Sequence, residues 1–339
     1  MIDVLVVGGG PIGLATALHA HAAGLRVEVL EPRSGPIDKA CGEGLMPAAV
    51  ASLAALGVRP VGMPLRGIRY ADRGRAVEAA FPDAPGRGVR RLELQRALTE
   101  AIEEAGIAVH RERAERIRVG PDDVAVGARR ARYLVGADGL HSSVRRAAGL
   151  DRRVRSTARY GLRRHFRIEP RSDLIEVHWG RHAEVYLTPV GPQELGVALL
   201  AARRGTWAEQ LEDFPDVRDL IAGAEPASVV RGAGPMRQRA SRVADGRVAL
   251  VGDAAGYVDA LTGEGLAVGL AAATELARCL ADDRLQDYPA AHRRVTWRSH
   301  ALTLGMLSIA RSPVLRRAIV PISSSVPWAY RGMVGVLAR

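Results

Sequence analysis

The sequence predicts an α/β fold in which a parallel sheet is interleaved with a second sheet and followed by a helical C-terminal segment. Three observations support this prediction. An apolar strand at residues 2–7 runs into a glycine-rich turn and a helix, a β-rich block spans about 154–230, and helical spacing dominates the last third of the 339 residues. Strands that alternate with helices are typical of parallel sheets, whereas apolar–polar alternation within a strand indicates a sheet with two unlike faces.

The glycine-rich turn at residues 8–13 has the spacing of a dinucleotide fingerprint between a strand and a helix. Gly8 allows a tight turn, Gly10 lets the backbone approach a pyrophosphate, and Gly13 allows close packing of helix on strand. The positive N-terminus of the following helix would then face the pyrophosphate. The residues that we assign to this role are Gly8, Gly10, Pro11, Ile12 and Gly13. The second apolar strand, at 27–30, ends in Glu31, whose carboxylate is placed to bind the adenosine ribose hydroxyls.

The remaining elements follow from spacing and from turn residues. Helical spacing predicts helices at 45–57, where Gly57 suits a C-terminal cap, and at 92–105. Extended segments are predicted at 65–81, 107–110 and 132–135, and the parallel pattern resumes at Arg247. We predict three parts: a discontinuous cofactor-binding part at 1–64, 90–153 and 240–290, a substrate-binding sheet at 65–89 and 154–239, and a helical segment at 291–339.

Two further turns carry an aspartate after an apolar strand: Asp138 within 134–146, and Asp253 within 248–256. Asp253 can accept hydrogen bonds from a polyol or ribose hydroxyl. The helix that begins near 263–265 offers backbone N–H groups to a developing anion. A reduced flavin carries negative charge near N1 and C2=O, so it needs this combination. The three turns together predict an FAD site.

In their order and separations, these three segments resemble the FAD-dependent group A monooxygenases of the para-hydroxybenzoate hydroxylase fold and the related geranylgeranyl reductases. The resemblance spans roughly residues 1–285 and implies a Rossmann-type FAD-binding domain with an interleaved substrate sheet. It also implies NADPH or NADH as electron donor, with Asp138 linked to both FAD and that donor. The cofactor residues that it implies are Gly8, Gly10, Pro11, Ile12, Gly13, Glu31, Arg33, Arg91, Asp138, Gly252, Asp253, Gly263, Gly265 and Leu266.

Two chemistries stay open within this resemblance. Gly256 and Ala260 stand where many of the hydroxylases have His and Pro, and the segments 40–45 and 261–265 are more similar to the reductases. The substrate segment associated with the reductases is poorly met, because Tyr186–Pro189 keeps only its ends. We therefore favour an NAD(P)H-dependent hydroxylation of a small aromatic or polyketide-like substrate through a flavin C4a-hydroperoxide. The alternative is reduction of an isoprenoid C=C bond.

Cys41, His178 and Tyr186 are the candidate catalytic residues. Cys41 lies between small residues near the expected flavin ring, and the other two lie in the alternating strands that should cover the substrate. Each also has a structural interpretation, since a cysteine can simply pack and a sheet histidine or tyrosine can simply hydrogen-bond. We predict no metal site, because His19 and His21 lack a third ligand.

The net charge of +11 raises nucleic acid as a partner, but the basic residues are scattered and only Lys39 is a lysine. We expect a solvated basic surface and no nucleic-acid partner. The fingerprint begins at residue 2 and only two cysteines occur, so we expect a cytoplasmic protein without a signal peptide. The tail at 302–339 contains three prolines and widely spaced arginines. It suits a helical lid or an amphipathic surface in peripheral contact with a membrane.

Overall fold

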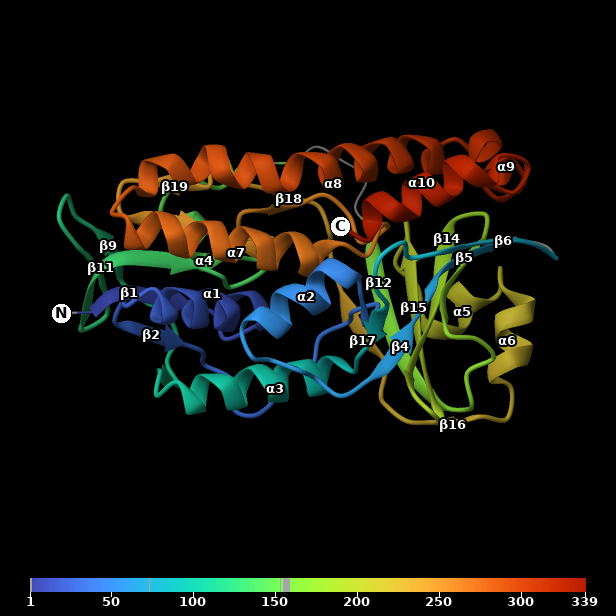
Figure 1. Ribbon diagram of the computed structural model, residues 1–339, viewed down its shortest axis with the longest axis horizontal. Helices are drawn as coiled ribbons and strands as arrows, with labels where there is room; N and C mark the ends of the chain where they lie inside the picture. The colour runs from blue at the N-terminus through green and yellow to red at the C-terminus, as the bar shows by residue number, and fades with distance from the viewer. Residues whose placement is uncertain (1, 73, 153, 155–158) are drawn as a thin grey trace.

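A computed structural model describes residues 2–72, 74–152, 154 and 159–339. Its two large sheets lie toward opposite ends of an elongated molecule, and helices α8, α9 and α10 run along one side of both (Figure 1). This arrangement confirms the predicted α/β fold. The division of the chain into cofactor-binding and substrate-binding ranges stays a prediction.

The first sheet has a parallel centre in the strand order β19-β20-β11-β1-β2-β8. Its central strand β1 pairs in parallel with β11 on one side and with β2 on the other. Strands β9 and β10 extend β11 with antiparallel pairing. The strand bounds are β1 (Ile2–Val7), β2 (Val27–Leu30), β8 (Ala108–His110), β9 (Ile117–Val119), β10 (Val124–Val126), β11 (Arg129–Gly136), β19 (Ala244–Asp245) and β20 (Val248–Leu250).

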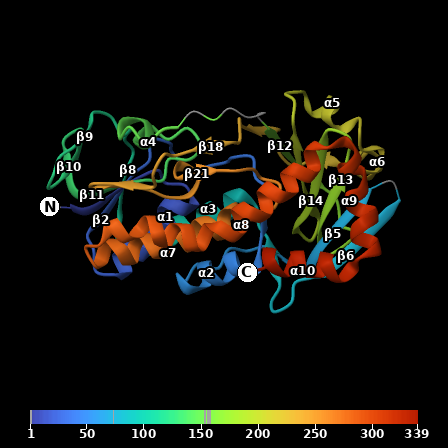
Figure 2. The same ribbon diagram turned by 90° about the horizontal axis from the view of Figure 1, so that it is seen from above.

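Helices cover one face of this sheet, with α1 packed between α3 and α7 and with α8 outside α7 (Figure 2). Their core is aliphatic and includes Val4, Leu98 and Leu276. The hydroxyl of Tyr288 donates to the Leu250 carbonyl at 3.0 Å, which fixes the start of α8 to the sheet. The helix bounds are α1 (Pro11–Ala22), α3 (Arg91–Glu104), α4 (Ser143–Ala147), α7 (Gly265–Ala281) and α8 (Tyr288–Arg311), with 3-10 turns η1 (Gly252–Ala254) and η2 (Leu285–Asp287).

The second sheet has the order β16-β12-β15-β14-β13-β5-β6, and β17 pairs with β12. Among the described strands of this sheet, β5 and β13 alone pair in parallel. A segment near residue 70 thus joins strands that lie about a hundred residues further along the chain. Short helices α5 and α6 cover one face of the sheet. The bounds are β5 (Gly67–Asp72), β6 (Arg75–Ala80), β12 (Tyr160–Arg167), β13 (Leu174–Trp179), β14 (Ala183–Gly191), β15 (Glu194–Ala201), β16 (Glu225–Pro226), β17 (Arg231–Ala233), α5 (Trp207–Leu211) and α6 (Pro215–Ile221).

Two small sheets and helix α2 (Pro47–Ala55) join the large sheets. The helix predicted at 45–57 is therefore shorter than expected. Gly57 adopts a φ of +76°, and the Val58 N–H donates to the Leu53 carbonyl at 2.9 Å, so Gly57 closes the helix as predicted. The small strands are β3 (Gly44–Leu45), β4 (Met63–Leu65), β7 (Gly86–Gly88), β18 (Gln238–Arg239) and β21 (Gly256–Tyr257).

The C-terminal helices α9 (Pro313–Ser325) and α10 (Pro327–Leu337) both pack against β6. The hydroxyl of Tyr330 donates to the Ile68 carbonyl at 3.1 Å, and the Ala338 carbonyl accepts from the Ala48 N–H at 3.1 Å. The end of the chain is thus attached both to the second sheet and to α2. Among the described residues, every helix is too short or too polar to cross a membrane.

Candidate functional site

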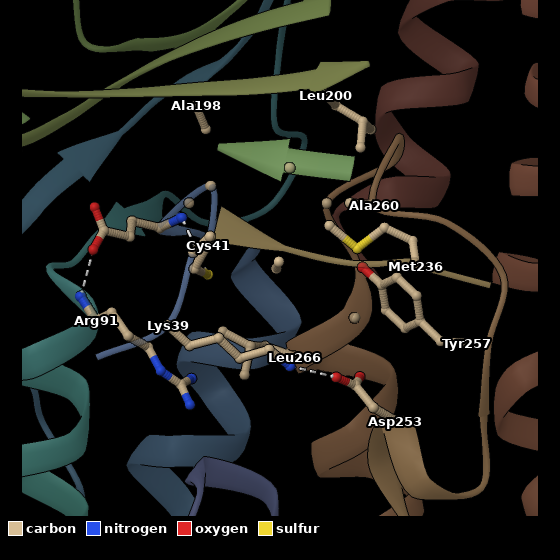
Figure 3. A pocket seen from close by; sticks show the side chains of 18 of the residues that line it. Lys39, Cys41, Arg91, Ala198, Leu200, Met236, Asp253, Tyr257, Ala260 and Leu266 are labelled. Atoms are coloured by element: carbon tan, nitrogen blue, oxygen red, sulfur yellow. Dashed lines mark hydrogen bonds and ion pairs between the residues drawn. The ribbon is translucent and has the colours of Figure 1, made fainter. Parts of the chain in front are cut away.

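A cavity of about 500 Å³ lies at the junction of the two large sheets (Figure 3). One wall comes from the first glycine turn, the loop at 37–44, the turns after β11 and β20, and the start of α7. The other wall comes from β5, β12, β13, β14 and β15, and Leu337 of α10 also lines the cavity. Its volume lies in the range typical of sites for small ligands and cofactors.

The first turn is built by close backbone contacts. Gly8 has a φ of +112°, and a Cβ atom added there would lie 2.5 Å from the Ala137 carbonyl oxygen. A Cβ on Gly13 would lie only 1.9 Å from the Gly8 carbonyl oxygen. Gly10 is different, because a Cβ there would meet nothing nearer than Nη2 of Arg91, at 3.9 Å. Gly8 and Gly13 therefore serve the packing of the chain itself, whereas the space beside Gly10 is open to the cavity.

Glu31 is buried behind this turn and is already hydrogen-bonded within the protein. Its Oε2 accepts from the Gly9 N–H at 2.8 Å, and both carboxylate oxygens accept from the Arg33 guanidinium. Burial by itself would raise the pKa of Glu31, but the hydrogen bonds from Arg33 and Gly9 outweigh it and hold the pKa below its usual value. The carboxylate is therefore ionised, and Arg33 reaches the cavity from it.

Arg91 begins α3 and is buried at the cavity wall. Its Nε is buried and lacks a hydrogen-bond partner within the described part of the chain. Burial lowers the pKa of Arg91, opposed by the nearby Cys41 and the carboxylates of Asp253 and Glu43, and a guanidinium stays charged under such conditions. A buried cation with an unused donor, next to an open glycine turn, suits a phosphate-bearing ligand.

The two predicted aspartates reach the same cavity from different strands. Oδ2 of Asp138 accepts from the Ser143 N–H at 2.6 Å and so caps α4, while its buried Oδ1 lacks a partner among the described residues. Oδ2 of Asp253 lies 3.0 Å from Nζ of Lys39 (Figure 3). In each carboxylate, Oδ2 is thus held by contacts within the protein, and both side chains line the cavity.

The start of α7 closes this side of the cavity. Gly263 has a φ of +69°, and Gly265 lies against the Tyr257 ring, where an added Cβ would be 3.3 Å from its Cε2. Gly252, with a φ of +59°, packs on Ile12. Gly263, Gly265 and Leu266 line the cavity, whereas Gly252 acts through its contact with Ile12.

Cys41 lies on the loop that faces the cavity, and its sulfur accepts from the Glu43 N–H at 3.4 Å. Burial raises the pKa of the Cys41 thiol, partly opposed by the positive charge of Arg91, so the sulfur stays protonated at neutral pH. Glu43 has a φ of +59°, accepts from the Arg91 N–H at 2.7 Å and contacts Nε2 of His165.

A buried polar cluster, which sequence reasoning missed, holds this loop. Besides Glu43, it contains His165 and Arg163 on β12, and Arg163 pairs with Asp38. Nδ1 of His165 lies 2.8 Å from the Ser228 hydroxyl. Lys39 and Gln95 were missed as well; Nε2 of Gln95 donates to the Gly9 carbonyl at 2.8 Å. Two basic residues two positions apart on β12, Arg163 and His165, share one face of the strand and are the signal that could have revealed this cluster.

The two remaining candidate residues take different positions. Tyr186 lines the cavity, and its hydroxyl donates to the Leu261 carbonyl at 2.9 Å; burial and the neighbouring Glu184 raise the pKa of Tyr186 well above its usual value. His178 is not among the described residues that line the cavity. It lies beside Glu176, with 3.5 Å between Nε2 of His178 and Oε2 of Glu176. Because Ile175 and Val177 line the cavity from the same strand, the alternation directs His178 to the other face.

The site fits FAD. The open space at Gly10, the unused buried Nε of Arg91 and the unused buried Oδ1 of Asp138 are groups that a pyrophosphate and polar cofactor atoms would occupy. The N-termini of α1 and α7 both border the same cavity, which favours anionic ligand groups there. Among the described residues, the histidines, cysteines and acidic side chains form no group that could hold a metal ion.

The fold and the site define an FAD-dependent oxidoreductase. The chain belongs to the family described as FAD binding domain, whose model matches residues 1–284. This finding confirms the flavoprotein resemblance.

Three known proteins are similar to this chain. Menaquinone reductase from Mycobacterium tuberculosis (strain ATCC 25618 / H37Rv) is 31% identical over 313 residues, which cover 79% of this chain and 74% of the relative. Digeranylgeranylglycerophospholipid reductase from Methanosarcina acetivorans is 28% identical over 289 residues, which cover 78% of this chain and 71% of the relative. The crystal structure of P. aeruginosa PqsL in complex with 2-aminobenzoylacetate has a TM-score of 0.80 at 22% identity and covers 95% of this chain and 99% of that chain.

We expect Asp253→Ala to weaken FAD retention while leaving the fold intact. A lost hydrogen bond to a charged group corresponds to about 1.5–3 kcal/mol, or roughly a tenfold to hundredfold weaker affinity. The ion pair with Lys39 is partly exposed, so the free energy of unfolding of the apoprotein should change by less than about 1 kcal/mol. Flavin fluorescence titration and urea unfolding measure the two effects. Asp245→Ala, at an exposed pair with Arg242, is the matched control, and equal FAD affinity in both variants would contradict the assignment.

Proposed function

We propose that this oxidoreductase reduces a C=C bond of an apolar, isoprenoid-like substrate. The observation that carries the proposal is the position of Cys41, a protonated thiol facing a cavity whose opposite wall is mainly aliphatic. The side chains of that wall include Ile68, Ile175, Val177, Leu200, Met236 and Leu337. The sequence alone favours hydroxylation of an aromatic substrate. The structure leads us to reverse this preference, because few polar groups on the substrate side of the cavity are free to bind a ligand.

Two hydroxyl groups on that side are used by the protein. The Tyr186 hydroxyl donates to the Leu261 carbonyl, and the Thr188 hydroxyl donates to the Gly42 carbonyl at 2.8 Å. A phenol or an aromatic acid requires partners for its own polar groups, because an unpaired buried polar group is costly. A hydrocarbon chain requires only apolar contact, so an isoprenoid suits this wall better.

When bound, FAD would supply the hydride, after reduction by NADPH or NADH as electron donor. Reduction of C=C adds that hydride to one carbon and a proton to the other, so the protein must provide an acid at the second carbon. Cys41 is placed for this role, since its thiol faces the cavity and its pKa is raised by burial. The cluster around Glu43 and His165 would hold the Cys41 loop in position, and the thiolate would regain its proton from water after product release.

The relatives support this choice of substrate class. Two proteins that share about three tenths of their residues with this chain over more than two thirds of its length are named as reductases of menaquinone and of a digeranylgeranyl lipid. Both names describe the reduction of a molecule that carries a long apolar chain. Hydroxylation of an aromatic compound is the second candidate, favoured by the aromatic ligand bound to PqsL, a protein with the same fold.

Product mass under air and without air separates the two chemistries. The FAD-loaded protein would be incubated with NADPH or NADH and either polyprenyl lipids or phenolic compounds. A gain of two hydrogens that does not require air supports the proposal. A gain of one oxygen that requires air would replace it with hydroxylation.

Cys41→Ser should lower the rate of C=C reduction by a factor of about 10²–10⁴, because an alcohol is a much weaker acid than a thiol. FAD affinity and the rate of flavin reduction by the nicotinamide donor should stay within about twofold, since neither step needs the thiol proton. Cys279→Ala, at a buried position of α7 away from the cavity lining, is the matched control. Equal turnover by the two variants would show that Cys41 only packs.

A further inference from the structure

The C-terminal fifty-two residues have an unusual charge pattern. From Tyr288 to Arg339 the sequence contains eight arginines and no aspartate, glutamate or lysine. Most of the net charge of +11 therefore comes from a small part of the chain that forms α8, α9 and α10. These helices lie along one side of the molecule (Figures 1 and 2).

Large apolar side chains are exposed on the same helices. We use the name C-terminal surface for the exposed side of α9 and α10 that carries five of them: Val314 (76% exposed), Leu315 (49%), Ile322 (58%), Trp328 (74%) and Val336 (43%). Single exposed apolar residues are ordinary, whereas a group of them on adjacent helices indicates an interaction site.

The packing of α9 and α10 directs these side chains outward. Both helices contact β6 and each other, with Ile319 and Val320 buried on α9 and with Tyr330 and Val334 buried on α10. The exposed residues lie on the opposite sides of the helices: Leu315 and Ile322 are seven residues apart, and Trp328 and Val336 are eight apart. Arg317 and Arg331 are exposed beside them.

We propose that the C-terminal surface docks on an anionic lipid bilayer, with its apolar side chains among the acyl chains and the exposed Arg317 and Arg331 at the lipid headgroups. Charge complementarity selects this occupant, since a segment without acidic residues attracts an anionic surface and repels a second copy of itself. Exposed aliphatic residues and a tryptophan next to basic residues are typical of helices that lie in a membrane interface. The charged backbone of a nucleic acid offers no apolar surface against which the exposed valine, leucine and isoleucine side chains could be buried.

The surface is also continuous with the site. Leu337, at the end of α10, is buried and lines the cavity, so the helix that carries Trp328 on its outer side forms part of the cavity wall. Docking would place the apolar part of the cavity next to the lipid phase. The inference does not depend on which reaction the site performs.

Co-sedimentation with lipid vesicles tests the proposal. The probes are vesicles of phosphatidylcholine alone and vesicles in which phosphatidylglycerol is mixed with phosphatidylcholine. We expect the FAD-loaded protein to bind the mixed vesicles, and we expect the binding to weaken with added salt. Absence of binding to the mixed vesicles would overturn the proposal, as would equal binding to both kinds.

Variants locate the contact. Ile322→Ser with Trp328→Ser should lower the vesicle partition coefficient roughly tenfold or more through lost apolar burial. Arg317→Gln with Arg331→Gln should lower it about tenfold on anionic vesicles only. Val61→Ser with Val229→Ser, at exposed valines elsewhere, is the matched control and should change nothing. Equal loss in the control, or a dimer in sedimentation velocity that Trp328→Ser abolishes, would assign the surface to another role; flavin content and far-UV circular dichroism verify that each variant is folded.

Discussion

Gly13→Ala should lower the free energy of unfolding by about 2–3 kcal/mol and remove most of the bound FAD. A methyl group at this position would lie 1.9 Å from the Gly8 carbonyl oxygen, an overlap of backbone with side chain that no rotamer can relieve. Helix α1 would have to move away from β1, and the glycine turn between them would open. Urea unfolding measures the first effect, and the flavin absorbance of the purified protein measures the second.

Gly305→Ala is the matched control, because it makes the same chemical change in the middle of another helix. A Cβ at Gly305 would meet no described atom within 4 Å. Alanine also favours a helix over glycine, so this variant should be unchanged or more stable by about 0.4–1 kcal/mol. The close-packing explanation fails if both variants have the same stability and the same flavin content.

Glu184→Gln should destabilise the protein by about 3–5 kcal/mol and loosen the C-terminal helices. Glu184 is fully buried in β14, where its carboxylate pairs with Arg159 and lies 2.7 Å from Nη2 of Arg316 on α9. Glutamine keeps the shape but removes the charge, which leaves the buried guanidinium of Arg316 facing the partly buried one of Arg159. Within the described part of the chain, Asp259 is then the remaining paired carboxylate, 3.3 Å from Arg159. Hydrogen exchange over residues 313–337 should increase more than exchange in β1.

Asp173→Asn tests whether burial, rather than pairing as such, gives this effect. Asp173 pairs with Arg66 at 3.1 Å, but both side chains are more than half exposed. Exposed pairs contribute about 0–1 kcal/mol because water and salt screen them, so this variant should keep nearly full stability. Similar losses in Glu184→Gln and Asp173→Asn would contradict the argument.

Local sequence signals were sufficient for the elements that consist of contiguous residues. The strand, glycine turn and helix at 2–22 follow from apolar runs and glycine spacing alone, and so does the cap at Gly57. The family and the FAD cofactor followed from three such segments. The elements could be predicted because apolar runs and glycine spacing act through residues that are close in the chain, and the family followed from the order and separations of the three segments.

Contacts between distant segments could not be predicted from the sequence. Nothing near Lys39 indicates that it pairs with Asp253, more than two hundred residues away, and nothing near Glu43 indicates His165 on β12. His178 and Tyr186 looked equivalent in alternating strands, yet only Tyr186 lines the cavity. Alternation shows that a strand has two faces, but only the packing of the sheet decides which face meets the cavity.

The sequence by itself therefore determined the class of fold, the flavin cofactor and the turns that border its site, because glycine spacing and apolar periodicity act through neighbouring residues. The tertiary structure decided the rest: the aliphatic wall opposite Cys41, the buried cluster that holds its loop, and the place of α10 beside the cavity. Those features arise where strands and helices from remote parts of the chain pack together, and that packing depends on the shape and burial of all of them at once.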